Sequence, residues 1–310
     1  MALPSTAKAE SHDVGGAADL RLLLMHQVML GDTVRMQAYD RALAQSIKPG
    51  DVVLDVGSGL LALSLLALRH GARHVYAVEG DPQTAALAQQ IAEHNTLRER
   101  LTIIQGDART VRLPVKANVI VSEMMGNFGP EEEMAEIIRR AARLNLRAGG
   151  QVVPSSLTSY LQAVELDNEG WGIWGEDFFG YSLSCIQEYA PAVPQLHFFS
   201  RTPRLLGAPV VVAGSRLGQD AQQPQGDYAI NVKVQGRLHA VMGYFSATLS
   251  GDITISNFPT YPGCNWAPCI WPVRYTDVFP GDVIRVHIKC PKHVRVITDW
   301  RLDCRIDRAA

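Results

Sequence analysis

The stretch VVLDVGSGLLA, at residues 52–62, joins an apolar run to a glycine turn and a second apolar run. The first run, Val52 to Leu54, is typical of a buried strand. Gly57 and Gly59 permit a tight turn and close approach of a ligand. A helix is expected to follow from Leu60 to His70. A strand, a glycine turn and a helix in this order are the first unit of a doubly wound parallel sheet.

The same alternation extends on both sides of this stretch. A helical region is expected from Leu20 to Gln45, and Lys48-Pro49-Gly50 ends it. Further apolar runs predict strands at residues 74–78, 101–104 and 118–121, and amphipathic segments predict helices at residues 82–95 and 131–144. Gly149-Gly150 is expected to end the last helix before another strand. We therefore predict a Rossmann-like α/β domain with N-terminal closing helices over residues 20–154, after a mobile segment at residues 1–19.

The second half, residues 155–310, has the pattern of antiparallel β-structure, which forms either a barrel or a sandwich. Residues 228–234, 239–249 and 283–288 alternate in strand fashion between turns rich in Gly, Pro and Asp. Five aromatic residues crowd between Trp171 and Tyr181, among chain breakers that suit a core strand poorly. We expect this segment, about residues 166–184, to form an arm that docks onto another surface.

The composition excludes several classes of protein. The 310 residues include 29 basic and 31 acidic side chains, a net charge of −2, so no basic footprint for nucleic acid is expected. The longest apolar stretch, Leu60 to Leu68, is far shorter than the roughly 18 residues of a membrane helix. The N-terminal residues have no signal-peptide core. Five cysteines without a C-x-x-C pair favour reduced thiols in the cytoplasm and predict no metal site.

Four acids follow four successive predicted strands: Asp55, Glu79, Asp107 and Glu123. Ligands of such sheets bind at the C-terminal ends of the strands. The loop reads G-x-G-x-x-A, which suits either NAD or S-adenosylmethionine (SAM), and a glycine turn without a ligand is the third possibility. SAM is favoured because Asp55 can pair with its cationic amino-acid end, Glu79 can accept both ribose hydroxyls, and Asp107 can accept from adenine. Each acid alone could instead be a helix cap or a solvated loop end.

A second acidic motif, SEMMGNFGPEEEM at residues 122–134, places Glu123 at a strand exit and Glu132 at a helix start. The intervening glycines and proline allow the loop to fold back and bring both carboxylates to one place. Two carboxylates held together call for a cation, and a planar guanidinium matches them. Taken alone, the acids near Glu132 are also typical of a helix N-terminus.

At this point the sequence resembles the protein arginine methyltransferase family. SEMMGNFGPEEEM is similar to the family's double-glutamate loop, and VLDVGSG to its SAM loop. HQVMLGDTVRMQAYDRAL (residues 26–43) resembles the helix that closes over SAM. FGYSLSCI, LHAVMGYF and NFPTYPGCNWAPCIWPV resemble segments of its β-barrel at residues 179–186, 238–245 and 257–273. We therefore expect a Rossmann-like SAM domain, then an antiparallel β-barrel with a dimerisation arm, in an atypical, short member of bacterial type.

The resemblance also implies roles for individual residues. Glu123 and Glu132 are the catalytic pair. Arg35 binds the SAM carboxylate, and Met29 borders the transferred methyl group. The remaining cofactor contacts are assigned to Asp55, Gly57, Gly59, Glu79, Asp107 and Ala108, and the substrate contacts to Asp32, Met134, Asn265 and Trp266.

Several positions depart from the family pattern. The signature His is Asn265, so Asp32 cannot form the family's Asp–His pair. The Trp after the first glutamate is Met124, and the adenine-contacting Glu is Arg109. The aromatic motif expected before His26 is absent. Because these changes cluster around the substrate channel, we interpret them as a change of substrate with the reaction retained.

The expected activity is methyl transfer from SAM to a guanidino nitrogen of arginine, by a homodimer. The nearly neutral surface slightly favours free L-arginine or a small guanidino metabolite over protein arginine as the partner. Two alternatives stay open: a SAM-dependent methyltransferase for another nucleophile, and a catalytically silent SAM-binding scaffold. An NAD dehydrogenase fits only the glycine loop.

Overall fold

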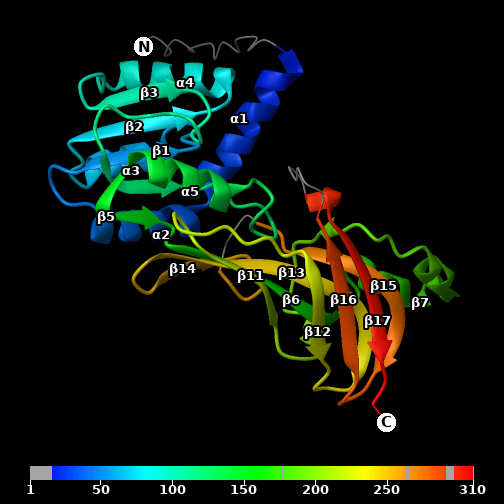
Figure 1. Cartoon of the computed structure of the whole chain (residues 1–310). Coiled ribbons are helices and arrows are strands. Elements are labelled where there is room, and N and C mark those ends of the chain that lie inside the picture. The colour runs from blue at the N-terminus through cyan, green and yellow to red at the C-terminus, as the bar shows by residue number, and fades with distance from the viewer. Residues whose placement is uncertain (1–15, 176, 263–265, 291–296, 310) are drawn as a thin grey trace, which may run out of the picture.

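The computed structural model describes residues 16–175, 177–262, 266–290 and 297–309, with side chains from residue 21 onward. Its elements form two parts, an α/β part over residues 16–153 and a β part over residues 156–309 (Figure 1). The first fifteen residues of the segment expected to be mobile lie outside the described ranges, and helix α1 (Gly16–Gly31) begins before the predicted start at Leu20. Within these ranges, no helix is long and apolar enough to cross a membrane.

Five parallel strands form the sheet of the α/β part, in the order β3-β2-β1-β4-β5. They are β1 (Val52–Val56), β2 (His74–Glu79), β3 (Leu101–Gln105), β4 (Ala117–Ser122) and β5 (Leu146–Val153). Every residue of the central strand β1 is buried, which explains its apolar sequence. Val53 lies opposite Val75 on one side and Val119 on the other. The predicted parallel sheet is confirmed.

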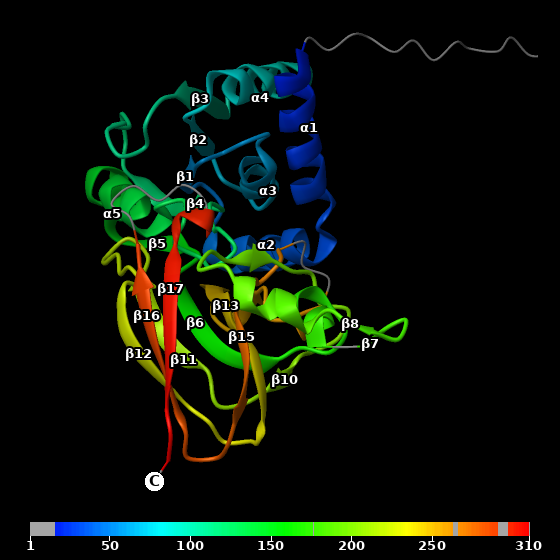
Figure 2. The same cartoon turned by 90° about the vertical axis from the view of Figure 1, so that its right-hand side faces the viewer.

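The helices cover both faces of this sheet, and Figure 2 shows α3 and α5 on opposite sides. Their bounds are α2 (Thr33–Ser46), α3 (Ala62–Arg69), α4 (Pro82–His94) and α5 (Met134–Asn145). The prediction of one helical region over residues 20–45 was wrong in detail. Asp32 separates α1 from α2, because its side chain caps α2 by accepting a hydrogen bond from Arg35 N at 3.1 Å.

Two further predictions in this part were wrong in their boundaries. Helix α5 begins at Met134 and not at Glu131, because Glu133 takes a left-handed backbone conformation with φ of 55°. Glu131 and Glu132 therefore belong to the loop. Gly149-Gly150 lies within strand β5 and does not end the helix, which stops at Asn145.

The β part consists of antiparallel sheets. The larger sheet has the order β10-β6-β13-β15-β9, with β11 beside β6 and β14 beside β13, and the smaller has the order β12-β16-β17. The bounds are β6 (Ser156–Glu165), β9 (Gln195–Leu196), β10 (Arg204–Leu205), β11 (Val210–Arg216), β12 (Gly226–Asn231), β13 (Gly236–Ser250), β14 (Ile253–Ser256), β15 (Cys269–Val278), β16 (Val283–Lys289) and β17 (Arg301–Asp307). Short 3₁₀ helices are η1 (Gly170–Gly175), η2 (Ser184–Tyr189) and η3 (Ile297–Asp299).

The expected closed barrel is not present among the described residues. The two sheets share a core that includes Phe128, Trp271 and Trp300, as in a sandwich. Among the described residues, the strand pairing between them is an isolated bridge between Gly207 and Val232. Full closure would need continuous strand pairing, which this single bridge does not provide.

The two parts pack directly against each other. Helix α2 contacts β13 and β14, and the Ser46 hydroxyl donates to the Ser250 hydroxyl at 3.1 Å. Phe245 and Ile255 of the β part belong to the same buried cluster as the α/β sheet. This shared core fixes the position of the β part against the strand exits of the parallel sheet.

The segment predicted as an arm carries a short hairpin of β7 (Asp177–Phe178) and β8 (Tyr181–Ser182), which protrudes from the β part in both cartoon views (Figures 1 and 2). Phe179 at its turn is 87% exposed and Tyr181 is 73% exposed. Trp171, in contrast, is buried and its indole N–H donates to Val273 O. The base of the segment is thus fixed to the β part while its tip projects aromatic side chains into solvent.

Candidate active site

The glycine loop between β1 and α3 forms one wall of the site. Gly57 and Gly59 have φ of 68° and 51°, which favours glycine. A side chain at Gly57 would also collide with Met124, because a Cβ there would lie 2.6 Å from its sulfur. Gly59 N donates to Glu79 Oε2 at 2.9 Å, which ties the loop to the end of β2. Glu79 Oε1 accepts from Asp81 N, so this carboxylate is held by backbone N–H groups.

Asp55 is a buried carboxyl at the end of β1, with 1% exposure. Its Oδ2 accepts a hydrogen bond of 2.6 Å from the Ser64 hydroxyl, whereas Oδ1 has no hydrogen-bond partner among the described residues. Burial raises the pKa of Asp55 to about 7. A buried carboxyl oxygen without a partner beside a glycine loop is a suitable acceptor for a cationic ligand group.

A cavity, here called the cofactor cavity, lies between this loop and the first two helices. Asp55, Gly57 and Gly59 line it from the sheet side, and Met29 and Arg35 line it from the helices. An anionic group near Arg35 and a cationic group near Asp55 would both find an opposite charge there. The residues present therefore fit the zwitterionic amino-acid end of SAM, in agreement with the contacts expected for these five positions.

Arg35 crosses from this cavity to the first catalytic candidate. Its Nη1 donates to Glu123 Oε2 at 2.9 Å, and its Nη2 donates to Met29 O at 2.9 Å. Its guanidinium carbon lies 4.2 Å from the ring centre of Trp266. Arg35 and Asp32 are both buried, and Arg35 Nε lies 3.7 Å from Asp32 Oδ2, so their ion pair is part of an internal network.

Glu123 and Glu132 line a second cavity of about 570 Å³, here called the mouth, together with Met29, Arg35 and Trp266. The loop thus brings both predicted catalytic carboxylates to one cavity. Burial raises the pKa of Glu123 to about 7 against the opposing effect of Arg35, and Glu132 raises it further. Glu132 keeps solvent contact, and desolvation by the surrounding chain raises the pKa of its carboxyl.

A third glutamate of this loop faces the core. Glu131 is 2% exposed, its Oε1 accepts from Phe128 N at 2.6 Å, and its Oε2 has no partner. Burial raises the pKa of Glu131 to about 7. This bond closes the turn between Asn127 and Glu131 and so shapes the loop that carries the catalytic candidates.

Asn257 fastens the double-glutamate loop to the β part. Its side-chain oxygen accepts from Phe245 N at 2.8 Å. Its Nδ2 donates to Asn127 O at 2.6 Å and to Ala267 O at 3.2 Å. Asn127 Nδ2 also donates to Ala267 O at 2.8 Å. Two buried amides therefore join the loop of Glu123 to the segment that carries Trp266.

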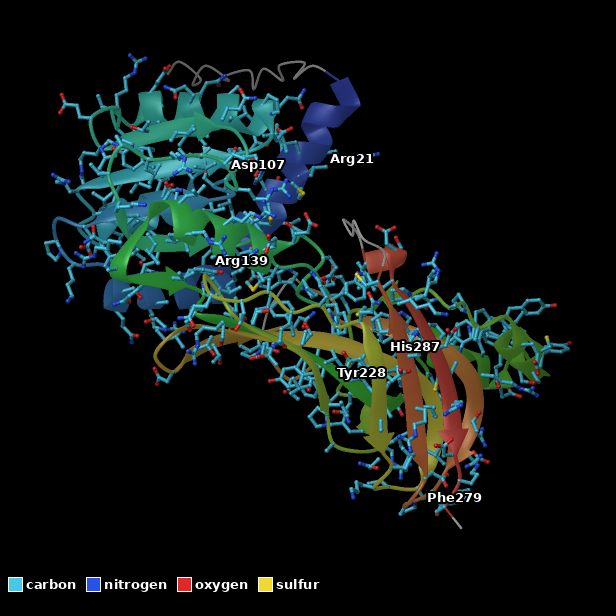
Figure 3. All side chains as sticks on the ribbon, viewed as in Figure 1. Arg21, Asp107, Arg139, Tyr228, Phe279 and His287 are labelled. Atoms are coloured by element: carbon cyan, nitrogen blue, oxygen red, sulfur yellow. The ribbon has the colours of Figure 1, made fainter. Side chains whose placement is uncertain are left out.

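Other predicted site residues lie elsewhere. Met134 is fully buried in the core and lines neither cavity, so the structure corrects its predicted contact with substrate. Ala108 is likewise in the core. Both carboxylate oxygens of Asp107 accept from Arg109 Nε at 3.0 Å, which engages the acid assigned to adenine (Figure 3). Asn265 lies outside the described residues.

Sequence reasoning missed Glu131, Asn257 and Tyr39 as parts of the site. Glu131 was considered only as an acid at a helix start, and no local signal marks it as buried. The hydroxyl of Tyr39 donates to Ser122 O at 2.9 Å beside the first catalytic candidate. The position of Tyr39 on the buried face of α2, among the apolar residues of a helical period, was the available signal.

A parallel sheet with a cavity that fits SAM beside a second cavity with two glutamates is typical of a SAM-dependent methyltransferase. Comparisons with known proteins identify the family. A family model described as PRMT5 arginine-N-methyltransferase matches residues 26–153. Protein arginine N-methyltransferase 1 of Chlamydomonas reinhardtii is 30% identical over 246 residues, 77% of this chain and 71% of that protein. The same-named protein of Dictyostelium discoideum is 30% identical over 86% of this chain and 81% of that protein. The chain belongs to the protein arginine N-methyltransferase family, whose methyl donor is SAM.

Solved structures share the fold. The Trypanosoma brucei PRMT1 enzyme–prozyme heterotetrameric complex with AdoHcy has a TM-score of 0.75 and 22% identity, over 92% of this chain and 93% of that chain. Protein arginine methyltransferase 10 of Arabidopsis thaliana has a TM-score of 0.74 and 22% identity, over 93% and 94%. The arrangement of α/β part and β part is therefore that of known arginine methyltransferases.

Proposed function

We propose that this enzyme methylates the guanidino nitrogen of arginine side chains in proteins, with Glu123 and Glu132 as the catalytic residues. The observation that carries this proposal is the place of Arg35. A guanidinium already lies between Glu123 and the face of Trp266, so the site is chemically suited to this group. Substrate arginine would present the same group to the two carboxylates from the mouth.

The residues of the cofactor cavity would hold SAM, which supplies an electrophilic methyl group on a sulfonium. In this proposal Arg35 binds its carboxylate and Asp55 its ammonium. Glu79, which is tied to the glycine loop through Gly59 N but does not line this cavity, would accept from the ribose hydroxyls of SAM. Gly57 and Gly59 give the backbone close approach to it. Met29 lines both cavities and so lies where methyl donor and acceptor meet.

Glu123 and Glu132 align the substrate and take up its charge. The arginine pKa exceeds about 12, so the substrate arrives protonated and is a poor nucleophile. The two carboxylates hold the positive charge of the guanidinium on one side of the group. They thereby turn one guanidinium nitrogen toward the methyl carbon, to within about 3–3.5 Å. That nitrogen forms the new C–N bond as the C–S bond breaks, and one glutamate accepts the proton released.

A protein substrate replaces the earlier preference for free L-arginine. The named relatives are protein arginine methyltransferases, and none supports a free amino acid as substrate. The mouth is also large and lined with apolar side chains beyond the two glutamates, such as Leu24, Met25 and Val28. Free arginine offers such a surface only its short methylene chain, whereas a polypeptide adds the side chains of neighbouring residues.

Two further parts of the proposal concern the state of the protein. Exposed aromatics at the tip of the arm support a homodimer in which each arm docks on the other subunit. Among the described residues, Cys185, Cys269 and Cys304 are free thiols, which supports a reducing, cytoplasmic compartment. The nearly neutral net charge of −2 favours neither nucleic acid nor an anionic membrane surface as a partner.

The test is methyl transfer from labelled SAM to arginine-containing peptides and to free L-arginine, measured by mass spectrometry. We expect methylated arginine in peptides only, and we expect Glu132→Gln to retain SAM binding while losing at least about 10²-fold in turnover. Glu133→Gln is the matched control, one residue further along the loop. Near-normal turnover in Glu132→Gln would contradict the double-glutamate mechanism.

Methylated free arginine without methylated peptide would restore the small-molecule function. Bound SAM without any methylated arginine would favour another nucleophile or a scaffold.

A further inference from the structure

A third cavity adjoins the mouth, and no glutamate is among its described lining residues. It has a volume of about 210 Å³ and is lined by five aromatic residues, two prolines and one amide: Phe198, Phe199, Phe258, Tyr261, Trp266, Pro259, Pro268 and Asn257. We call it the aromatic pocket. Phe198 and Trp266 line both the mouth and this pocket, so the two cavities are neighbours. The proposed function makes no use of it.

The pocket is built by the packing of the β part and is not a loose surface loop. Its segment 197–199 is fixed beside β15, because His197 N donates to Pro268 O at 3.1 Å and β9 pairs with β15. Phe258 packs against Tyr244 with ring centres 4.9 Å apart. Phe198 is nevertheless 67% exposed. A fixed aromatic wall with one exposed ring can gain contacts from an incoming apolar group.

The charges around the two cavities select among occupants. Among the described lining residues, the mouth has only Glu123 and Glu132 as acids, both assigned to the target guanidinium, and the aromatic pocket has none. Arg21 of α1 lines the mouth and adds positive charge (Figure 3). Additional basic residues in a substrate would therefore find repulsion and no partner. This arrangement disfavours arginine- and glycine-rich tails.

We propose that the aromatic pocket is a substrate subsite that binds an aromatic side chain of the polypeptide, a few residues from the target arginine. This inference rests on the proposed function and specifies its substrate class. Trp266 lies between the guanidinium site and the aromatic pocket. The Arg35 guanidinium lies over the Trp266 ring, and the same residue lines the pocket. The target arginine then enters the mouth while the aromatic side chain packs edge to face against Phe198 or Phe258.

The test measures peptide binding and methylation separately. Fluorescently labelled peptides carry one arginine flanked by glycines, with phenylalanine, leucine or lysine placed at each position within three residues of it. Binding is measured by anisotropy with S-adenosylhomocysteine present. We expect one or two phenylalanine positions to bind at least about tenfold more tightly than the glycine peptide, and lysine to weaken binding. Methylation rates should follow the same order.

Phe198→Ser should bring the phenylalanine and glycine peptides to equal affinity. Phe279→Ser is the matched control, since Phe279 is 47% exposed at the far end of the β part (Figure 3) and should leave the ratio unchanged. Equal affinity for phenylalanine, leucine and glycine peptides in the unaltered enzyme would overturn the inference. So would a change of oligomeric state in Phe198→Ser without a change in the peptide ratio, since a second copy would then occupy the pocket.

The binding measurement distinguishes a failure of this inference from a failure of the proposed function. Selective binding of phenylalanine peptides without methylation would leave the subsite standing and overturn the proposed activity. If all peptides bind with equal affinity and are methylated at equal rates, the proposed activity stands and the subsite is overturned.

Discussion

Arg35 and Glu123, 88 residues apart in sequence, form a buried ion pair of 2.9 Å between the cofactor cavity and the mouth. In the proposed function the same arginine binds the SAM carboxylate and the same glutamate binds the substrate guanidinium. Arg35 cannot pair at full strength with Glu123 and with the SAM carboxylate at the same time. We infer that cofactor binding draws Arg35 toward the cofactor cavity and frees Glu123 for substrate.

The first prediction follows from this competition. An arginine peptide should bind weakly to the enzyme alone and at least about tenfold more tightly with S-adenosylhomocysteine present, as measured by calorimetry. The coupling is reciprocal, so the peptide should strengthen cofactor binding by the same factor. Arg35→Gln should weaken cofactor binding and abolish the coupling. Arg41→Gln, an exposed arginine on the same helix, is the control. Equal peptide affinity with and without cofactor product would refute the competition.

The second prediction concerns Glu131 and the pH dependence of stability. Its pKa lies near 7 in the folded protein and near its ordinary value of 4.5 when unfolded. The folded state therefore binds more protons than the unfolded state between these values, and stability falls as pH rises through this window. The loss from this group alone between pH 5.5 and 8 is about 2 kcal/mol.

Glu131→Gln removes this titration. Relative to the unaltered enzyme, the variant should gain about 2 kcal/mol in unfolding free energy between pH 5.5 and 8, as measured by urea denaturation. Glu136→Gln is an informative control because hydrogen bonds from Arg140 and Arg139 lower the pKa of Glu136. Its contribution to stability is present at neutral pH and lost as pH falls. A pH-independent difference for Glu131→Gln would show that this carboxyl titrates normally in the folded state.

The third prediction tests the junction at Asn257. Asn257→Ala removes three hydrogen bonds and leaves Phe245 N–H and Asn127 O without side-chain partners, whereas Ala267 O keeps the bond from Asn127 Nδ2. We expect a loss of about 2–4 kcal/mol in stability, because each unsatisfied buried group costs about 1–3 kcal/mol. Turnover should fall at least about tenfold, since the loop of Glu123 is no longer fixed to the segment of Trp266.

SAM affinity separates this role from general unfolding. Asn257 lies outside the cofactor cavity, so binding of SAM to Asn257→Ala should stay within about twofold at a temperature where the variant is folded. Asn231→Ala, at an exposed position of β12, should change neither turnover nor SAM affinity. Normal turnover in Asn257→Ala would mean that the loop holds its shape without this amide.

The α/β part was predictable because its signals are local. An apolar run predicts β1, and the glycine turn predicts the ligand wall beside it. The loop with Glu123 and Glu132 was also readable, since a strand exit and breakers fix its ends. What the sequence did not predict depends on long-range packing. The burial of Glu131 comes from the β part covering the loop, where the Ser159 hydroxyl donates to Phe128 O, and closure of a barrel depends on pairing between distant strands.

The last prediction concerns the arm. Phe179 is 87% exposed at the turn of the β7–β8 hairpin and Phe178 beside it is 56% exposed, with their rings 4.9 Å apart in an edge-to-face pair. Such an exposed apolar tip on a fixed base is typical of a contact between subunits. We expect the unaltered enzyme to have the mass of a dimer by light scattering, and Phe179→Ser to shift it toward monomer at micromolar concentration. Val211→Ser, at an apolar site on β11 that is 55% exposed, should remain dimeric. A monomeric unaltered enzyme, or a dimer that Phe179→Ser leaves intact, would show that the arm serves a different contact.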